Sequence, residues 1–233
     1  MAISDSAQLS HHSCAVLFWG VLKCWGLNNY GQLGLGDAVL RAVGVGSIGC
    51  ALPAVDVGTG RTVKAVGTGG DIEHTVSGHT CALLDNDTVK CWGRNNWGQL
   101  GLGDATTRGD APWQMGDSLP AVDVGAGRSV KQLSVGGFHS CVILDNGALK
   151  CWGRNDFGQL GLGNVLTKGD GPGEMGDALP AVDLGTGPLQ KAGMVSAGTA
   201  HSCALLLDGS IKCWGAGNEG RLGYGSSGNR GGG

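Results

Sequence analysis

Eight of the nine cysteines form four pairs whose members stand ten positions apart. The pairs are Cys14 and Cys24, Cys81 and Cys91, Cys141 and Cys151, and Cys203 and Cys213. Cysteines at a fixed spacing can form a disulfide, bind a metal ion, or fill a buried apolar position as free thiols. Zinc thiolate sites are usually built from closer CxxC spacings, so the pattern favours disulfides, with buried thiols as the alternative.

The residues between each pair of cysteines predict a β-hairpin. In the third pair, residues 145–147 read Asp-Asn-Gly, which fits a three-residue loop whose last residue is left-handed. Pairing then runs outward from Leu144 and Ala148 until Cys141 faces Cys151 across the two strands. If the pair that closes the loop, Leu144 and Ala148, is hydrogen-bonded, alternation makes the cysteine pair a non-hydrogen-bonded one. The Cα atoms of such a pair lie about 4.5 Å apart, within reach of a disulfide. The left-handed position is taken by Gly20, Asp87, Gly147 and Gly209 in the four hairpins.

The hairpins belong to a 25-residue motif that occurs four times without gaps, and the third copy reads HSCVILDNGALKCWGRNDFGQLGLG. The copies span residues 12–36, 79–103, 139–163 and 201–225. An array of such units, with 47 glycines in 233 residues and no long helical period, predicts an all-β repeat protein. We expect one array over residues 1–225 and a flexible glycine-rich tail over 226–233.

Each repeat of about 60 residues contains enough short apolar segments for four strands. In the third repeat these are a strand near 128–135, the hairpin 139–152 and an extended LPAVDL piece after a polar loop. Four short strands per repeat predict the four-stranded antiparallel sheet of a β-propeller blade. The ends of the array look cut, so we expect a partial or small propeller, completed by a longer chain or by an oligomer.

The motif, with its H[ST]C strand, KCWG and GQLGLG at fixed offsets, resembles the repeat of the regulator of chromosome condensation family. The resemblance covers all four copies and implies β-propeller blades that serve as platforms for protein partners. It also implies an alternative function, guanine-nucleotide exchange on a small GTPase, for which no protruding acidic hairpin can be identified among the repeats. Ultraviolet-B sensors with this fold carry their sensing tryptophans before the repeat histidine. This chain has His11, Gly78, Phe138 and Ala200 at those positions, so ultraviolet sensing is not expected.

The recurring histidines and tryptophans predict structural roles. The histidines are His12, His79, His139 and His201, and the tryptophans are Trp25, Trp92, Trp152 and Trp214. One hydrogen bond from each histidine to a neighbouring turn explains its recurrence without a metal ion, and the tryptophans suit packing between blades. Because every acid and histidine of the motif has counterparts in the other copies, no catalytic set stands out. We expect a non-enzymatic protein with no cofactor.

Candidate binding residues lie where the repeats differ or carry long loops. The atypical segment between the first two copies contains Asp71, Glu73 and His74, which have no counterparts. The loops over 104–118 and 164–178 should lie on a common side of neighbouring blades. From them we select Arg108, Asp110, Trp113, Lys168 and Asp170. Arg108, Gly109 and Asp110 spell a cell-adhesion tripeptide, but the third repeat has Lys168, Gly169 and Asp170 there, so we interpret the match as repeat drift.

Charge and cysteine content restrict partners and compartment. The net charge of −3 provides no basic surface for nucleic acid, and no run of eighteen apolar residues indicates insertion in a membrane. A protein partner of unknown identity is therefore expected. Oxidised cysteines favour an extracellular or secretory-lumen location, and reduced ones the cytoplasm or nucleus. Cys50 is predicted to be unpaired and exposed.

Overall fold

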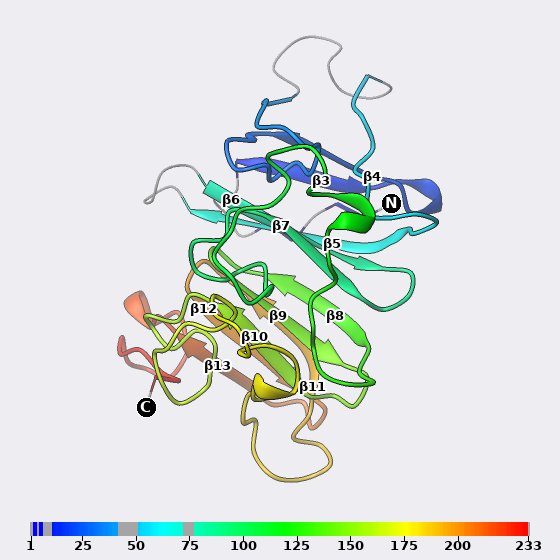
Figure 1. Ribbon diagram of the computed structural model, residues 1–233. Helices are drawn as coiled ribbons and strands as arrows, with labels where there is room; N and C mark the ends of the chain where they lie inside the picture. The colour runs from blue at the N-terminus through cyan, green and yellow to red at the C-terminus, as the bar shows by residue number, and fades with distance from the viewer. Residues whose placement is uncertain (1, 4, 7–10, 42–50, 72–76, 233) are drawn as a thin grey trace.

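The computed structural model describes residues 2–3, 5–6, 11–41, 51–71 and 77–232, which form short β-strands and one-turn 3-10 helices (Figure 1). No α-helix occurs in these residues, and no helix among them is long and apolar enough to cross a membrane. The strands form four sheets that follow one another along the chain, from blue to orange in Figure 1. The prediction of an all-β array of propeller blades is confirmed.

Each sheet is one blade, and each blade contains one of the predicted hairpins. The first blade consists of β1 (Ala2–Ile3), β3 (His12–Val16) and β4 (Leu22–Gly26). The second consists of β5 (Val63–Asp71), β6 (Ser77–Leu84) and β7 (Val89–Gly93), with β2 (Asp5–Ser6) parallel to β5. The third consists of β8 (Val130–Val135), β9 (His139–Leu144) and β10 (Leu149–Gly153). The fourth consists of β11 (Ala192–Ala197), β12 (His201–Leu206) and β13 (Ile211–Gly215).

The hairpin register agrees with the prediction. Cys141 lies opposite Cys151 in the pairing of β9 with β10, and the amide of Leu144 donates to the carbonyl of Ala148 over 2.9 Å. The third loop residue is left-handed in all four hairpins, at Gly20, Asp87, Gly147 and Gly209. Glycine adopts this conformation without a Cβ clash, and aspartate is among the residues that tolerate it.

The expected fourth strand of the first three blades is less regular than predicted. In the second repeat the LPAVDV piece contributes one hydrogen bond to the sheet, from the amide of Val122 to the carbonyl of Val89 over 2.8 Å. Val182 makes the same bond to Leu149 at 2.8 Å, and Val55 to Leu22 at 2.9 Å. A proline precedes each of these valines by two positions and has no amide hydrogen to donate, which is consistent with an edge segment instead of a full strand.

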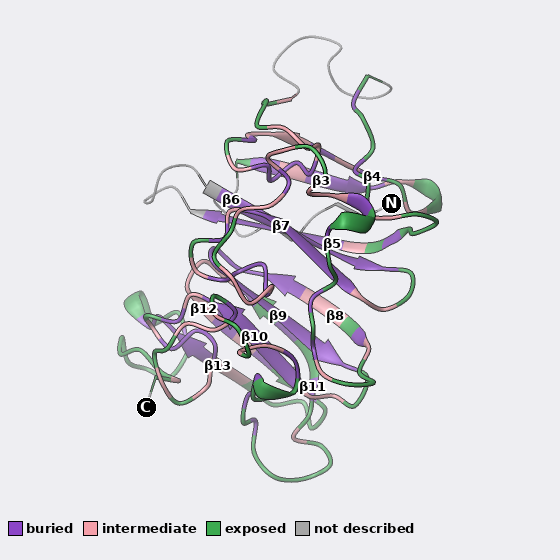
Figure 2. Cartoon of the chain, in the orientation of Figure 1, coloured by how far each residue is buried: buried purple, intermediate pink, exposed green. Residues whose placement is uncertain are grey.

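The apolar core lies between successive blades and not within one blade. Cys141, Ile143 and Leu149 of the third blade pack with Val195 and Leu206 of the fourth. Equivalent clusters join the first blade to the second and the second to the third. Figure 2 shows the buried strands of the second and third blades and the exposed loops around them. Each blade therefore needs a neighbour to cover its apolar face.

The C-terminal residues are part of this architecture. Arg230 forms a backbone bridge with Gly215, as Arg108 does with Gly93 and Lys168 with Gly153. The carbonyl of Gly231 also accepts a bond from the amide of Gly163. Every repeat makes this backbone bridge, and the flexible tail expected over residues 226–233 stays a prediction.

Candidate binding site

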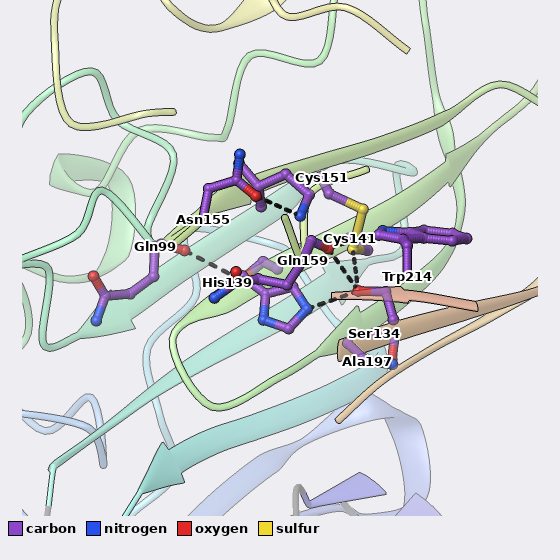
Figure 3. The surroundings of a disulfide bond; sticks show 12 residues. Gln99, Ser134, His139, Cys141, Cys151, Asn155, Gln159, Ala197 and Trp214 are labelled. Atoms are coloured by element: carbon purple, nitrogen blue, oxygen red, sulfur yellow. Dashed lines mark hydrogen bonds between the residues drawn. A yellow bond between two sulfur atoms is a disulfide. The ribbon is translucent and has the colours of Figure 1, made fainter. Parts of the chain in front are cut away.

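A chain of hydrogen bonds joins every pair of neighbouring blades. At the junction of the third and fourth blades, His139 Nε2 lies 2.8 Å from the Ser202 hydroxyl, which donates to the carbonyl of Gln159 over 2.9 Å. The indole of Trp214 donates to the same carbonyl over 2.9 Å. Figure 3 shows His139 and Trp214 beside the Cys141–Cys151 disulfide. The earlier blade thus supplies a histidine and a carbonyl, and the later blade supplies a hydroxyl and an indole.

The other two junctions repeat these contacts. His79 Nε2 lies 3.0 Å from the Ser140 hydroxyl, and His12 Nε2 lies 2.8 Å from the Thr80 hydroxyl. Trp152 donates to the carbonyl of Gln99 and Trp92 to that of Gln32. The prediction that the tryptophans pack between blades is confirmed at these positions. The expected bond from histidine to a turn is wrong in detail, because its partner is a hydroxyl on the next blade.

The hydrogen-bond geometry defines the state of the buried histidines. The Ser202 hydroxyl has one hydrogen and directs it to Gln159, so it must accept a hydrogen from His139 Nε2. His139 Nδ1 then carries no hydrogen, and it has no hydrogen-bond partner. Burial lowers the pKa of His139 to about 3, with a smaller contribution from His201, so the ring is neutral. Burial likewise lowers the pKa of His12 and His79 to about 3.

All four predicted cysteine pairs form disulfides with Cα atoms 4.1 Å apart. The sulfur of Cys141 lies 3.9 Å from the Ser202 hydroxyl, so the third disulfide contacts the fourth blade. The cysteines of the first three pairs have no exposed surface, whereas Cys203 and Cys213 are half-buried. Among the described residues, no three histidine, cysteine, aspartate or glutamate side chains are placed to hold a metal ion.

The long loops lie across the preceding blade. A Cβ atom on Gly31, in the first GQLGLG turn, would lie 2.2 Å from the backbone nitrogen of Asp110, and Gly98 has the same relation to Asp170. Only glycine permits this approach, which fixes each loop to the earlier turn. The two loops therefore occupy equivalent positions relative to their blades.

Trp113 stands out within these loops. Its side chain is 90% exposed, and its backbone has a φ of 68°, a left-handed conformation that is unfavourable for a residue with a Cβ. It borders a hollow of about 570 Å³, shared between the first and second repeats. The apolar lining includes Leu35, Pro53, Ala54, Pro112 and Met115. A large aromatic side chain beside an apolar hollow is typical of a surface that binds a partner.

Polar residues also line this hollow. The Asp117 carboxylate accepts hydrogen bonds from the amide and hydroxyl of Thr59, at 2.9 and 2.5 Å. These bonds, with a smaller contribution from Lys90, lower the pKa of Asp117. Arg41 also lines the hollow, where it forms an ion pair of 2.6 Å with Asp37. The lining therefore combines apolar side chains with a carboxylate that stays ionised at neutral pH.

An equivalent hollow of about 360 Å³ lies between the second and third repeats. Its lining repeats the first with Leu102, Pro120, Ala121, Pro172 and Met175, but Gly173 stands where the first hollow has Trp113. The chain thus contains the same hollow with and without the aromatic side chain.

A family comparison fits this repeated geometry. The sequence profile described as "Regulator of chromosome condensation (RCC1) repeat" matches residues 76–99, 130–159 and 195–221. The three matched segments are regulator of chromosome condensation repeats. The matched segments contain the hairpins of the second, third and fourth blades, and the first blade repeats their register and their contacts.

Curated relatives share parts of this repeat array. Human "Probable E3 ubiquitin-protein ligase HERC4" is 35% identical over 149 residues, which cover 64% of this chain and 12% of that protein. "Ultraviolet-B receptor UVR8" of Arabidopsis thaliana is 29% identical over 221 residues, 94% of this chain and 42% of the receptor. The chain thus spans less than half the length of both relatives.

Solved structures show the same fold. Human WBSCR16 superposes with a TM-score of 0.70 at 20% identity, over 99% of this chain and 51% of that one. Prp20p from Saccharomyces cerevisiae, studied for "its binding properties to Gsp1p and histones", superposes with a TM-score of 0.67 at 20% identity. That match covers 98% of this chain and 48% of Prp20p. The likeness establishes the propeller fold of the regulator of chromosome condensation repeats.

The remaining predicted site residues are distributed over the repeats. Arg108 forms an ion pair of 2.7 Å with Asp104, and Lys168 one of 3.1 Å with Glu174. Burial raises the pKa of Asp170, and the neighbouring Glu174 carboxyl raises it further. These contacts hold the loops in shape. In loop 104–118, Trp113 is the exposed side chain with the largest apolar area.

The atypical segment between the first two motif copies is only partly described. Asp71 ends β5, where its backbone pairs with Ser77, while Glu73 and His74 lie outside the described residues, as does Cys50. Their proposed roles stay predictions.

The sequence did not indicate the lining of the hollow. Leu35, Ala54 and Met115 belong to segments that recur in the repeats, and recurrence favoured a structural role. The one sequence feature that pointed to the hollow was Trp113, because the equivalent position of the otherwise similar third-repeat loop is Gly173.

Proposed function

We propose that the chain is a non-enzymatic protein-interaction platform whose partner is bound at the hollow beside Trp113. The observation that supports this is the exposed indole, which stands on a left-handed backbone and lines the hollow. A left-handed non-glycine residue costs about 1–2 kcal/mol, and exposed Trp113 gains little burial within the chain to offset that cost. Tryptophan is also among the residues that most often dominate binding energy at protein interfaces.

The chemistry of the hollow suggests the kind of partner. Its lining contains apolar side chains together with the carboxylates of Asp56 and Asp117. A peptide segment with an apolar side chain followed by a lysine or arginine would satisfy both features. The apolar group would pack on Trp113 and Met115, and the cation would approach Asp117.

Selection of peptides on the folded protein tests this proposal. Peptides from a random display library are selected on the wild-type chain and their affinities measured for Trp113→Gly, which reproduces the sister hollow with Gly173. We expect the substitution to weaken binding about 30-fold, as at an interface hot spot, with no loss of stability because glycine suits the left-handed backbone. Trp19→Gly, at another exposed tryptophan, should leave the affinity unchanged.

Selected peptides that bind Trp113→Gly as well as the wild type would overturn the placement of the site. A double substitution, Trp113→Gly with Gly173→Trp, provides a stricter test, because it should move peptide binding to the second hollow. The unfolding midpoint of each variant shows whether a lost affinity reflects lost structure.

The atypical segment forms a second, independent part of the proposal. Asp71, Glu73 and His74 have no counterparts in the other repeats, so we infer that a partner contacts them specifically. Removing residues 71–74 should leave the fold intact and weaken capture of a protein partner. Unchanged capture would exclude this segment from the interface.

Nucleotide exchange on a small GTPase is the alternative function. The support for it is the shared fold with Prp20p, whose binding to Gsp1p is named for that protein. Release of a fluorescent guanine nucleotide from a loaded small GTPase, with and without this chain, decides between the two. Acceleration by the chain would favour exchange, and an unchanged release rate favours a binding platform.

A further inference from the structure

The outer face of the fourth blade carries residues equivalent to those with which each of the first three blades contacts the next blade. In the third blade, Ile143 and Leu149 are 4% and 0% exposed because the fourth blade covers them. Their counterparts Leu205 and Ile211 are 37% and 66% exposed. Together with Met194 and the Cys203–Cys213 disulfide, these two residues form what we call the docking face.

The polar half of the junction is also present and unused on the fourth blade. His201 corresponds to His139, and Arg221 occupies the position of Gln159 in the GQLGLG turn. Among the described residues, neither His201 Nε2 nor the Arg221 carbonyl has a hydrogen-bond partner, whereas His139 and Gln159 are bonded to the next blade. The docking face therefore offers a donor and an acceptor at the positions where a hydroxyl and an indole bind elsewhere in the chain.

The first blade carries the complementary groups on its opposite face. Ser13 corresponds to Ser202, and Trp25 corresponds to Trp214. Ser202 and Trp214 are buried against the preceding blade, whereas Ser13, Leu17 and Trp25 are partly exposed. No bond from the Ser13 hydroxyl or the Trp25 indole is found among the described residues. We call Ser13, Leu17 and Trp25 the insertion face.

We infer that the docking face binds the insertion face of a second copy of this chain, head to tail. The contact would repeat a junction that occurs three times within the chain: His201 donates to Ser13, and Ser13 and Trp25 donate to the Arg221 carbonyl. Leu17 would enter the apolar pocket formed by Leu205 and Ile211. The inference rests on the junctions between blades and not on the hollow at Trp113, so the two can fail separately.

The proposal includes a stoichiometry for the head-to-tail contact. Such an interface is heterologous, so it closes into a ring only when the rotation per copy divides a full turn. Two copies would give eight blades, which lies within the range of four to eight found in propellers. The expected particle is thus a dimer with two equivalent junctions.

Sedimentation equilibrium of the oxidised chain over a hundredfold range of concentration tests the inference. We expect a mass twice that of the 23.5 kDa chain at high concentration. Ile211→Asp places a charge on the docking face, and Ser13→Glu places one on the insertion face. Each variant alone should remain monomeric, while Trp113→Gly should dimerise like the wild type.

Mixing the two monomeric variants gives the sharpest result. Ile211→Asp retains an intact insertion face and Ser13→Glu retains an intact docking face, so the mixture should form a heterodimer through one junction. A monomeric wild type at all concentrations would overturn the inference. So would self-association of Ser13→Glu alone, which would indicate that two docking faces pack on each other. Circular dichroism and four intact disulfides confirm that each variant is folded.

Discussion

The third and fourth blades share one sequence pattern but differ in what covers them. In both blades, one face of the hairpin carries a disulfide and two apolar residues, one on each strand. The two apolar residues are Ile143 and Leu149 in the third blade and Leu205 and Ile211 in the fourth. In the third blade these groups are buried, and in the fourth the apolar pair is exposed. The difference shows that burial in this protein is a property of the junction between blades and not of the blade itself.

The comparison also separates local from long-range stabilisation. The hairpin register, the left-handed loop residue and the disulfide are the same in both blades, so they do not depend on cover by a following blade. The buried histidine does, because the next blade encloses His139, and this burial lowers its pKa to about 3. The pKa of the half-buried His201 is also lowered by burial, with Arg221 as a smaller cause, but its ring lacks the hydroxyl partner.

Truncating the apolar residue that begins the second hairpin strand should give the largest difference between the two blades. Leu149→Ala leaves a cavity among Val195 and Leu206 and should lower the free energy of unfolding by about 2–5 kcal/mol. Ile211→Ala, at the same position of the fourth blade, should lower it by less than about 0.5 kcal/mol because Ile211 is exposed. Urea unfolding at low protein concentration measures both.

Equal losses for the two alanine variants would contradict the account of the junctions. If Ile211→Ala becomes costly only at high protein concentration, the added loss reports the proposed dimer, since association stabilises the folded state by mass action.

Acidification should also distinguish the two blades, with a smaller effect. The pKa of His139 is about 3 in the folded chain and about 6.5 in an unfolded one, so below pH 6.5 only the unfolded state takes up the proton. The free energy of unfolding should therefore fall by up to about 1.4 kcal/mol per pH unit for this histidine as the pH drops from 6.5 toward 3. Above pH 6.5 the histidine contributes no slope.

Replacing each histidine with glutamine isolates this contribution. His139→Gln keeps an amide donor for Ser202 but cannot be protonated, so the fall in stability between pH 6 and pH 5 should become shallower. His201→Gln should change the slope less, since His201 is half-buried. A slope that is unchanged by His139→Gln would mean that another group causes the acid sensitivity.

The sequence predicted the local structure of each repeat because local rules determine it. The loop length and the glycine at position 147 define the register, and the register places Cys141 opposite Cys151. The bonds of His139 and Trp214 were not predictable, since their partners come from another repeat and from a backbone carbonyl. Trp113 was predicted as a candidate binding residue, but its hollow depends on how loop 104–118 lies over the first blade.

A surface ion pair should provide the smallest effect. The third blade has Arg128 paired with Asp145 over 3.3 Å, where the fourth has Gln190 and Leu207. Introducing Gln190→Arg with Leu207→Asp should raise the free energy of unfolding by at most about 1 kcal/mol, because such pairs are screened by solvent. Thermal unfolding at low and high salt measures the gain, which should vanish at high salt. A larger, salt-independent gain would point to improved packing instead.

Controlled reduction of the disulfides tests most directly the central claim that each blade is covered by the next. Without reductant, alkylation of the native chain should modify one thiol, Cys50. With limited reductant and dilute protein, the next thiols modified should be Cys203 and Cys213, because the sulfurs of the other three pairs are enclosed by a following blade. Peptide mass mapping identifies the order. Modification of Cys141 and Cys151 together with or before Cys203 and Cys213, or of nine thiols without reductant, would contradict the account.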